Sequence, residues 1–406
     1  MRKLSARRVA LVLSGSAVLL AAGSILPAQA ATSGWRVAAS VTAKGRVVLL
    51  TGIAAPAAND AWASGISATS SAKGTLEVIE HWNGQSWKQV SLPSPVAKVW
   101  SNPAGAFQVI GASSSTNVWA FGEIPTATGE SATYLRLSGR RWTTGTLPGS
   151  SSASGPGILV TSVEVLGNSN VWAFGGRLVP GSEQPLAAPY AAHFNGHRWS
   201  AVGVPGSNEI TAVSEVTPSD MWAVTGVNAF GAAFGLGGPS QPASGLLHWN
   251  GSAWQVAAVE PSGLPSGANL TAITAARGNQ LVVGGDVANS QDESTSAFVD
   301  QFNGTTWSAP STLPAFSSGG ELASLVPNGR GGLWALSTNL DSSRSQLWQY
   351  SGGLWSSPAS PKFGSPLCEL MQLAAVSGGK SVWAAATAGT EKVPHGIIAV
   401  EGPTPR

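Results

Sequence analysis

The chain has 406 residues, of which only 10% are charged, and its 22 basic and 20 acidic residues give a net charge of +2. Soluble domains usually contain about a quarter charged residues, so this charge pattern excludes the strong electrostatic attraction on which nucleic-acid binding depends. Cys368 is the single cysteine, which excludes an internal disulfide and leaves core packing and topology to hold the fold.

The first thirty residues predict an export signal. They begin with the basic stretch "MRKLSARR", continue as an apolar run over Val9–Leu26 and end in "PAQA", the small-residue pattern of a signal-peptidase site. We expect cleavage after Ala30 and a secreted, extracellular protein. A membrane anchor fits less well, because the apolar run is short, is broken by Gly and Ser, and is followed by no stop-transfer charges. Cleavage leaves 18 basic minus 20 acidic residues, a net charge of −2, so we expect neither a nucleic-acid partner nor stable membrane insertion.

Two short phrases alternate along the rest of the chain. One occurs seven times, as "NDAWASG", "TNVWAFG", "SNVWAFG", "SDMWAVTG", "NQLVVGG", "GGLWALS" and "KSVWAAA". The other is typified by "HWNGSAW" (His248–Trp254) and occurs in six complete copies between His81 and Trp355. The spacing of about 50 to 60 residues is typical of the blades of propeller proteins.

Each repeat predicts four short strands. In the fourth repeat they are Glu209–Val216, Met221–Val224, Gly245–Asn250 and Ala253–Val259, called strands a to d below. The Asn-Gly pair between strands c and d predicts a tight hairpin, because both residues tolerate positive φ. No helical period is visible after the leader. We therefore predict an all-β fold, in which residues 31–406 form a single seven-bladed β-propeller of four-stranded blades.

The ends of the chain predict how the ring closes. The seventh repeat ends with "HGIIAVEGPTPR" (His395–Arg406) and has no strand d. The segment "SGWRVAAS" (Ser33–Ser40) has the tryptophan and the alternation of a strand d, but no strand c precedes it. We expect this N-terminal strand to complete the last blade and to close the ring without a covalent bond.

The stretch "LLHWNGSAW" (Leu246–Trp254) could form a sugar-binding cleft, because it places aromatic rings beside a histidine. However, Trp249 and Trp254 occupy positions that recur in most repeats, which favours a role in the core. His248 shares its position with Arg, Gln and other His residues, which favours a hydrogen-bonding strand residue over a ligand contact.

These motifs resemble a known repeat family. "VWAFGG" (Val171–Gly176) followed by "AAHFNGHRW" is similar to a kelch repeat, and the alternation with "HWNGxxW" resembles the secreted propeller repeats of actinobacteria, often grouped with the central domain of galactose oxidase. The resemblance implies a fold and no activity. The redox enzymes of that group hold copper through tyrosines, histidines and a cysteine crosslink. Here the candidate residues lie in different repeats at no matching spacing, so we expect no copper site and no cofactor: Tyr134, Tyr190, Tyr350 and Cys368.

The two faces of the predicted ring differ in their connections. The a–b and c–d connections are short and lie on one side, which we call the turn face. The b–c and d–a connections lie on the opposite side, the loop face, and vary in length. Variable loops on a rigid scaffold are a usual place for binding, although each could be a tolerated insertion. The long connections are Ser64–Gly74, Ser94–Gly105, Gly175–Pro189, Gly226–Gly245 and Ser357–Glu369.

Two groups of residues on the loop face are candidate ligand contacts. Trp100 lies outside the repeat pattern beside Asn102, and the pair could bind a sugar ring or simply anchor the loop. A second group shares one position at the start of strand a, and these side chains could bind a cation or a polar ligand or contact loop amides. This group consists of Glu209, Asn269, Glu321 and, close to the same position, Glu369.

No motif of a known catalytic site is present. The sequence contains no His or Cys cluster with zinc spacing, no P-loop and no nucleophile elbow, so we predict no metal site and no catalytic residue. We expect a monomeric, secreted, non-catalytic module that binds a glycan or another extracellular protein. The alternative is a carbohydrate-active enzyme, a glycosidase or lyase, that uses acids such as Glu209 and Glu321.

Overall fold

The structure is a computed structural model, and it describes residues 34–69, 76–100, 106–126, 129–150, 157–179, 186–227, 244–261, 263–276, 280–288, 295–308, 310–313, 321–339, 344–358, 367–390 and 393–403, with the backbone alone at some ends of strands and of the helix. The predicted leader, residues 1–30, lies outside these ranges. None of the helices in the described ranges has the length and apolarity needed to cross a bilayer.

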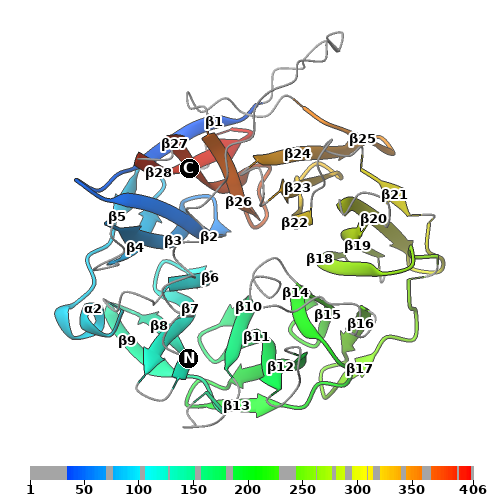
Figure 1. Cartoon of the computed structure of the whole chain (residues 1–406), viewed down its shortest axis with the longest axis horizontal. Helices are drawn as coiled ribbons and strands as arrows, with labels where there is room; N and C mark the ends of the chain where they lie inside the picture. The colour runs from blue at the N-terminus through cyan, green and yellow to red at the C-terminus, as the bar shows by residue number, and fades with distance from the viewer. Residues whose placement is uncertain are drawn as a thin grey trace.

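Seven four-stranded antiparallel sheets form a ring, with the first strand of each sheet nearest the ring axis (Figure 1). Blade 1 consists of β2 (Val47–Ala57), β3 (Asp60–Ala68), β4 (Leu76–Trp82) and β5 (Trp87–Gln89), and blade 2 of β6 (Ala106–Ser114), β7 (Asn117–Thr126), β8 (Gly129–Ser138) and β9 (Arg141–Thr146). Blade 3 consists of β10 (Ile158–Gly167), β11 (Asn170–Val179), β12 (Leu186–Phe194) and β13 (Trp199–Val202), and blade 4 of β14 (Glu209–Thr217), β15 (Asp220–Gly226), β16 (Gly245–Trp249) and β17 (Trp254–Val256).

Blade 5 consists of β18 (Ala268–Ala276), β19 (Gln280–Ala288), β20 (Thr295–Asn303) and β21 (Ser311–Thr312), and blade 6 of β22 (Glu321–Pro327), β23 (Leu333–Asn339), β24 (Arg344–Ser351) and β25 (Leu354–Ser356). Blade 7 consists of β26 (Leu367–Ala375), β27 (Val382–Thr390), β28 (Val393–Glu401) and, as its outer strand, β1 (Arg36–Val41). The predicted seven-bladed propeller of four-stranded blades is confirmed.

Several strands run further toward the loop face than the sequence predicted. β3 extends to Ala68, so the first five residues of the predicted connection Ser64–Gly74 are strand. A short helix, α2 (Ser94–Trp100), stands in the connection Ser94–Gly105, where we predicted a loop. The amides of Val96 and Ala97 donate to the Pro93 carbonyl at 2.9 Å each, and Val96 is buried among the apolar side chains of blades 1 and 2. A seven-residue helix is too short to show the periodicity by which helices are recognised.

The N-terminal strand closes the ring as predicted. β1 pairs antiparallel with β28, with Arg36 opposite Val400 and Val41 opposite Gly396. Trp35, just before this strand, is 7% exposed and packs edge-on against Trp334 of blade 6 at 5.5 Å between ring centroids. The first described strand of the chain thus lies beside the last (Figure 1).

Tryptophans recur because they join one blade to the next. The strand-b residue Trp119 of blade 2 packs against Phe194 and Trp199, from strands c and d of blade 3, at 5.0 and 5.4 Å. Trp383 of blade 7 packs in the same way on Trp82 and Trp87 of blade 1 at 5.4 and 5.1 Å. A buried tryptophan removes about 150–250 Å² from water, so the repeated phrases encode the joints between neighbouring sheets.

A β-bulge in strand a adds a polar joint. All seven innermost strands shift register against strand b at the same point. In blades 3 to 5 the extra residue is a threonine whose hydroxyl donates to a carbonyl of the following blade. Thr211 Oγ1 lies 2.8 Å from Leu270 O, and Thr271 Oγ1 lies 2.6 Å from Leu322 O. The bulge turns this side chain out of the usual alternation and toward the next sheet.

The Asn-Gly hairpins differ in detail from the prediction. Gly84 has φ of 87°, but among the described residues outside glycine only Asn208 has a positive φ, so Asn83 does not. Instead, the Asn83 Oδ1 accepts the amides of Gln85 and Ser86 at 3.1 and 3.0 Å. This side-chain bond caps a longer turn, and the turns at Asn195, Asn250 and Asn303 repeat it.

Candidate functional site

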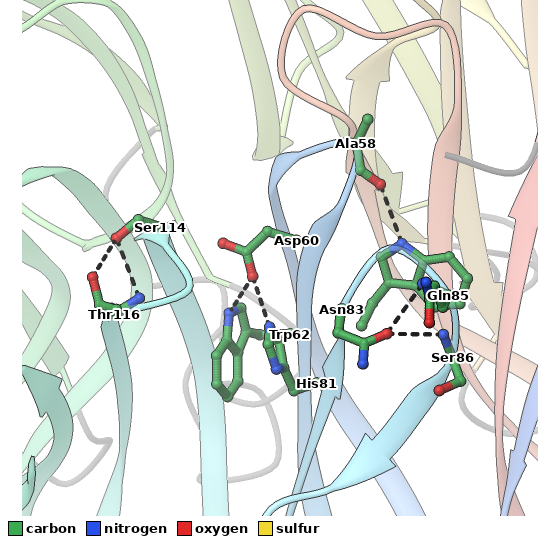
Figure 2. A network of polar contacts seen from close by, with 10 residues as sticks. Ala58, Asp60, Trp62, His81, Asn83, Gln85, Ser86, Ser114 and Thr116 are labelled. Atoms are coloured by element: carbon green, nitrogen blue, oxygen red, sulfur yellow. Dashed lines mark hydrogen bonds and ion pairs between the residues drawn. The ribbon is translucent and has the colours of Figure 1, made fainter. Parts of the chain in front are cut away.

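The histidines of the recurring phrases belong to a polar network on the turn face. In blade 1, Asp60 Oδ1 accepts hydrogen bonds from Trp62 Nε1 and His81 Nε2, both at 2.9 Å (Figure 2). The imidazole of His81 stacks on the indole of Trp62 with 4.0 Å between ring centroids. This arrangement holds strands b and c together and engages the histidine on its Nε2 and on its ring face.

The same network confirms that His248 is a strand residue of the scaffold. Its Nε2 lies 2.8 Å from Asp220 Oδ1, and its ring stacks on Trp222 at 4.2 Å. In blade 3, His193 donates to Asn170 at 2.9 Å, and burial lowers the pKa of His193. The strand-c histidines His81, His193 and His248 therefore stabilise the sheets.

The four strand-start residues of the loop face share one register, as predicted. In each blade, one residue of strand a pairs with the central residue of strand b, and the strand-start residue lies five positions before it. The extra residue that separates Glu369 from Trp383 in sequence falls in the a–b connection, so Glu369 takes the same place as the other three. The pairs across strands a and b are Glu209 with Gly226, Asn269 with Asp286, Glu321 with Thr338, and Glu369 with Thr387.

Asn269 and Asp286 form the centre of the candidate site, between blades 4 and 6. Asn269 Oδ1 accepts the Val227 amide at 2.7 Å, and its Nδ2 donates to Val227 O at 2.6 Å and to Asp286 Oδ1 at 3.0 Å. Asn269 thus makes the loop-amide contacts of the alternative interpretation. Asp286 is 7% exposed, and burial together with repulsion from Glu321 raises its pKa to about 7. Near neutral pH this carboxyl group therefore holds a proton far more readily than an ordinary aspartate does.

The other two acids at the strand starts lie in different surroundings. Glu209 has no exposed surface, so it is enclosed by the blades around it. Glu369 is half-buried, and burial raises its pKa. Among the described residues, no three His, Cys, Asp or Glu side chains come close enough to hold a metal ion. The predicted residues thus form an arc over blades 4 to 7 of which Asn269, Asp286 and Glu321 are brought together.

Trp100 and Asn102 stay predictions. Trp100 is the last residue of α2, where the backbone alone is described, and Asn102 lies outside the described residues.

Two interacting pairs of acids were missed in the sequence analysis. Asp286 lies on strand b, whereas the predicted residues lie at the starts of strand a. The signal that could have found it is the acid in "GGDV", because only one other blade has an acid at this position of strand b, Glu123 in blade 2. Glu164 and Glu215, on the inner strands of blades 3 and 4, also interact. Burial, and then repulsion from Glu215, raises the pKa of Glu164 to about 8.

Comparison with known proteins finds solved structures of similar overall arrangement. No family model and no curated protein matches the chain. The solved structures that it resembles include a protein of unknown function from Dyadobacter fermentans (9% identity, TM-score 0.50, covering 91% of this chain and 100% of that one). They also include the fucose-specific lectin from Aleuria aurantia (12% identity, TM-score 0.43, covering 80% of this chain and 100% of that one). A third is the polysaccharide lyase Uly1 (9% identity, TM-score 0.48, covering 97% of this chain and 95% of that one). At these identities the likeness concerns the β-propeller fold alone.

Proposed function

We propose that the protein is a secreted, non-catalytic binding module whose loop face recognises an extracellular glycan. A protein ligand on the same face is the other form of this proposal. The observation that carries it is the Asn269–Asp286–Glu321 group, at the loop-face end of the blades. A carboxyl group that keeps its proton can both donate and accept hydrogen bonds, as sugar hydroxyls do. The Asn269 amide, fixed by two hydrogen bonds to the Val227 backbone and one to Asp286, positions that carboxyl group before any ligand arrives.

Export and family are part of this proposal and rest on the sequence. The leader with its cleavage site after Ala30 supports an extracellular location, and mass spectrometry of the mature N-terminus tests it. The kelch-like resemblance, and with it a relation to secreted actinobacterial repeats, rests on the two alternating phrases. We also propose a monomer that needs no cofactor.

An enzyme is the second candidate because of one observation. A carboxyl group with a pKa of about 7 beside a second acid, as Asp286 is beside Glu321, is the arrangement of a general acid with its partner carboxylate in glycosidases. Against this role, no motif of a known catalytic site accompanies these acids in the sequence.

A glycan and cell-wall array, with hydrolysis products measured in parallel, separates the two candidates. We expect binding without turnover, and weaker binding by Glu321→Gln. The control is Glu215→Gln, which neutralises an exposed acid near the turn-face end of an inner strand and should bind as the unmodified protein does. Turnover that Glu321→Gln abolishes would refute a binding-only module. Loss of binding in Trp100→Ala without any turnover would support it.

A further inference from the structure

Basic side chains occupy the c–d turns of two neighbouring blades, 2 and 3, on the turn face. The turn of blade 2 carries Arg140 and Arg141, and that of blade 3 carries His197 and Arg198; all four are exposed. The corresponding turns of blades 1, 4, 5 and 6, "NGQS", "NGSA", "NGTT" and "SGGL", carry no charge. The cluster is therefore a local departure from the repeat.

Arg136 connects the two turns across the seam between the blades. Its guanidinium lies 4.7 Å from the ring centroids of both Trp119 in blade 2 and Phe194 in blade 3. Trp199, which follows Arg198, packs on Trp119 at 5.4 Å, so the second turn is anchored on the first blade. We call this set the basic strip: Arg136, Arg140, Arg141, His197 and Arg198.

The sequence around the basic strip supplies no acid to balance it. In blades 1 and 4 the histidine of strand c faces Asp60 or Asp220, whereas in blades 2 and 3 the same places hold the neutral Asn117 and Asn170. The turn-side segments 113–119, 136–143, 166–172 and 193–200 contain no Asp or Glu. Within the described part of the chain, no ion pair involves an arginine of the strip.

We propose that the basic strip binds a linear anionic polysaccharide that carries sulfate or carboxylate groups. A guanidinium group presents paired N–H donors that match the oxygens of these groups. Three exposed arginines on two blades, with the half-buried Arg136 in the seam between them, fit a chain with repeated charges better than a single small anion. The half-buried Trp142 and Trp199 offer no exposed ring on which bases could stack, which disfavours a single-stranded nucleic acid. This surface is separate from the loop-face site and does not depend on it.

The test compares two double variants that remove the same charge. Arg140→Gln with Arg198→Gln changes one arginine in each blade, and the residue 198 backbone amide keeps its bond to Asn195. The control, Lys44→Gln with Lys380→Gln, removes two charges outside the strip. Binding to dextran sulfate and to alginate, against uncharged dextran, is measured over a range of salt concentrations, and thermal melting checks that both variants fold.

We expect the unmodified protein and the lysine double variant to bind at least one of the two anionic polymers at low salt and to ignore dextran. The arginine double variant should bind about tenfold more weakly, with a shallower salt dependence, because each exposed charge pair contributes modestly. Dextran sulfate and alginate distinguish sulfate from carboxylate recognition. Equal weakening in both double variants, no binding by the unmodified protein, or equally tight binding of single-stranded DNA would overturn the proposal.

Discussion

Replacing Trp35 tests the closure of the ring, since this residue belongs to the one strand d that comes from the other end of the chain. Trp35 is 7% exposed and packs on Trp334 and the apolar side chains of blade 7. Truncating such a residue in Trp35→Ala should cost about 3–5 kcal/mol, from lost burial and the cavity that it leaves. Unfolding entropy is about 2.1 cal/mol/K per residue, or about 0.8 kcal/mol/K for some 370 residues, so Tm should fall by about 4–6 °C.

Calorimetry or near-UV circular dichroism measures the shift, and Val37→Ala is the matched control. Val37 lies on the same strand but is 44% exposed, so its truncation should lower Tm by less than about 1 °C. A stronger form of the test deletes residues 33–40, which also removes the ladder between β1 and β28. Equal Tm values for Trp35→Ala and Val37→Ala would refute the view that this N-terminal strand locks the ring.

Two further predictions concern buried polar groups. Burial raises the pKa of Glu80 and that of Asp286 to about 7 each. An acid whose pKa is raised by folding stabilises the fold below its unfolded pKa. This contribution is lost as the pH rises through 7. The free energy of unfolding of Glu80→Gln should therefore exceed that of the unmodified protein by about 1–3 kcal/mol at pH 8, and the difference should vanish at pH 4. Urea denaturation measures both proteins across this range, and parallel pH profiles would contradict the prediction. Thr211→Val removes the hydroxyl that donates to Leu270 O and should lower the free energy of unfolding by about 1–2 kcal/mol. The control Thr305→Val, in an exposed turn, should leave it unchanged. Equal denaturation midpoints for the two variants would rule out the proposed joint.

Much of the fold was predictable because its signals are local. The hairpin around Asn250 and the phrase around Trp222 each lie within a few residues, and their repetition predicts the number of blades and the direction of every strand. The orphan strand at Trp35 was predictable because a strand d needs a strand c beside it. The helix α2 was missed, since a helix of seven residues leaves no periodic signal.

The candidate site was predictable only in part. The shared register of Asn269 and Glu321 followed from counting residues back from strand b, and pairing confirms it. The meeting of Asp286 with Glu321 was not visible, because they lie on different strands of neighbouring blades and at different distances from any repeated phrase. The basic strip was missed for the same reason, since its arginines belong to separate repeats.

By itself the sequence determined the repeat: which residues alternate along each strand, where each hairpin turns, and which end lacks a strand. The tertiary structure alone decided what meets across the seams. Trp119 lies between the aromatic residues of the next blade, Arg136 over Trp119 and Phe194, and Asp286 near Glu321. The physical reason is that strand pairing is specified by neighbours in the chain, whereas packing between blades joins residues that are tens of positions apart and depends on how the sheets twist and stack.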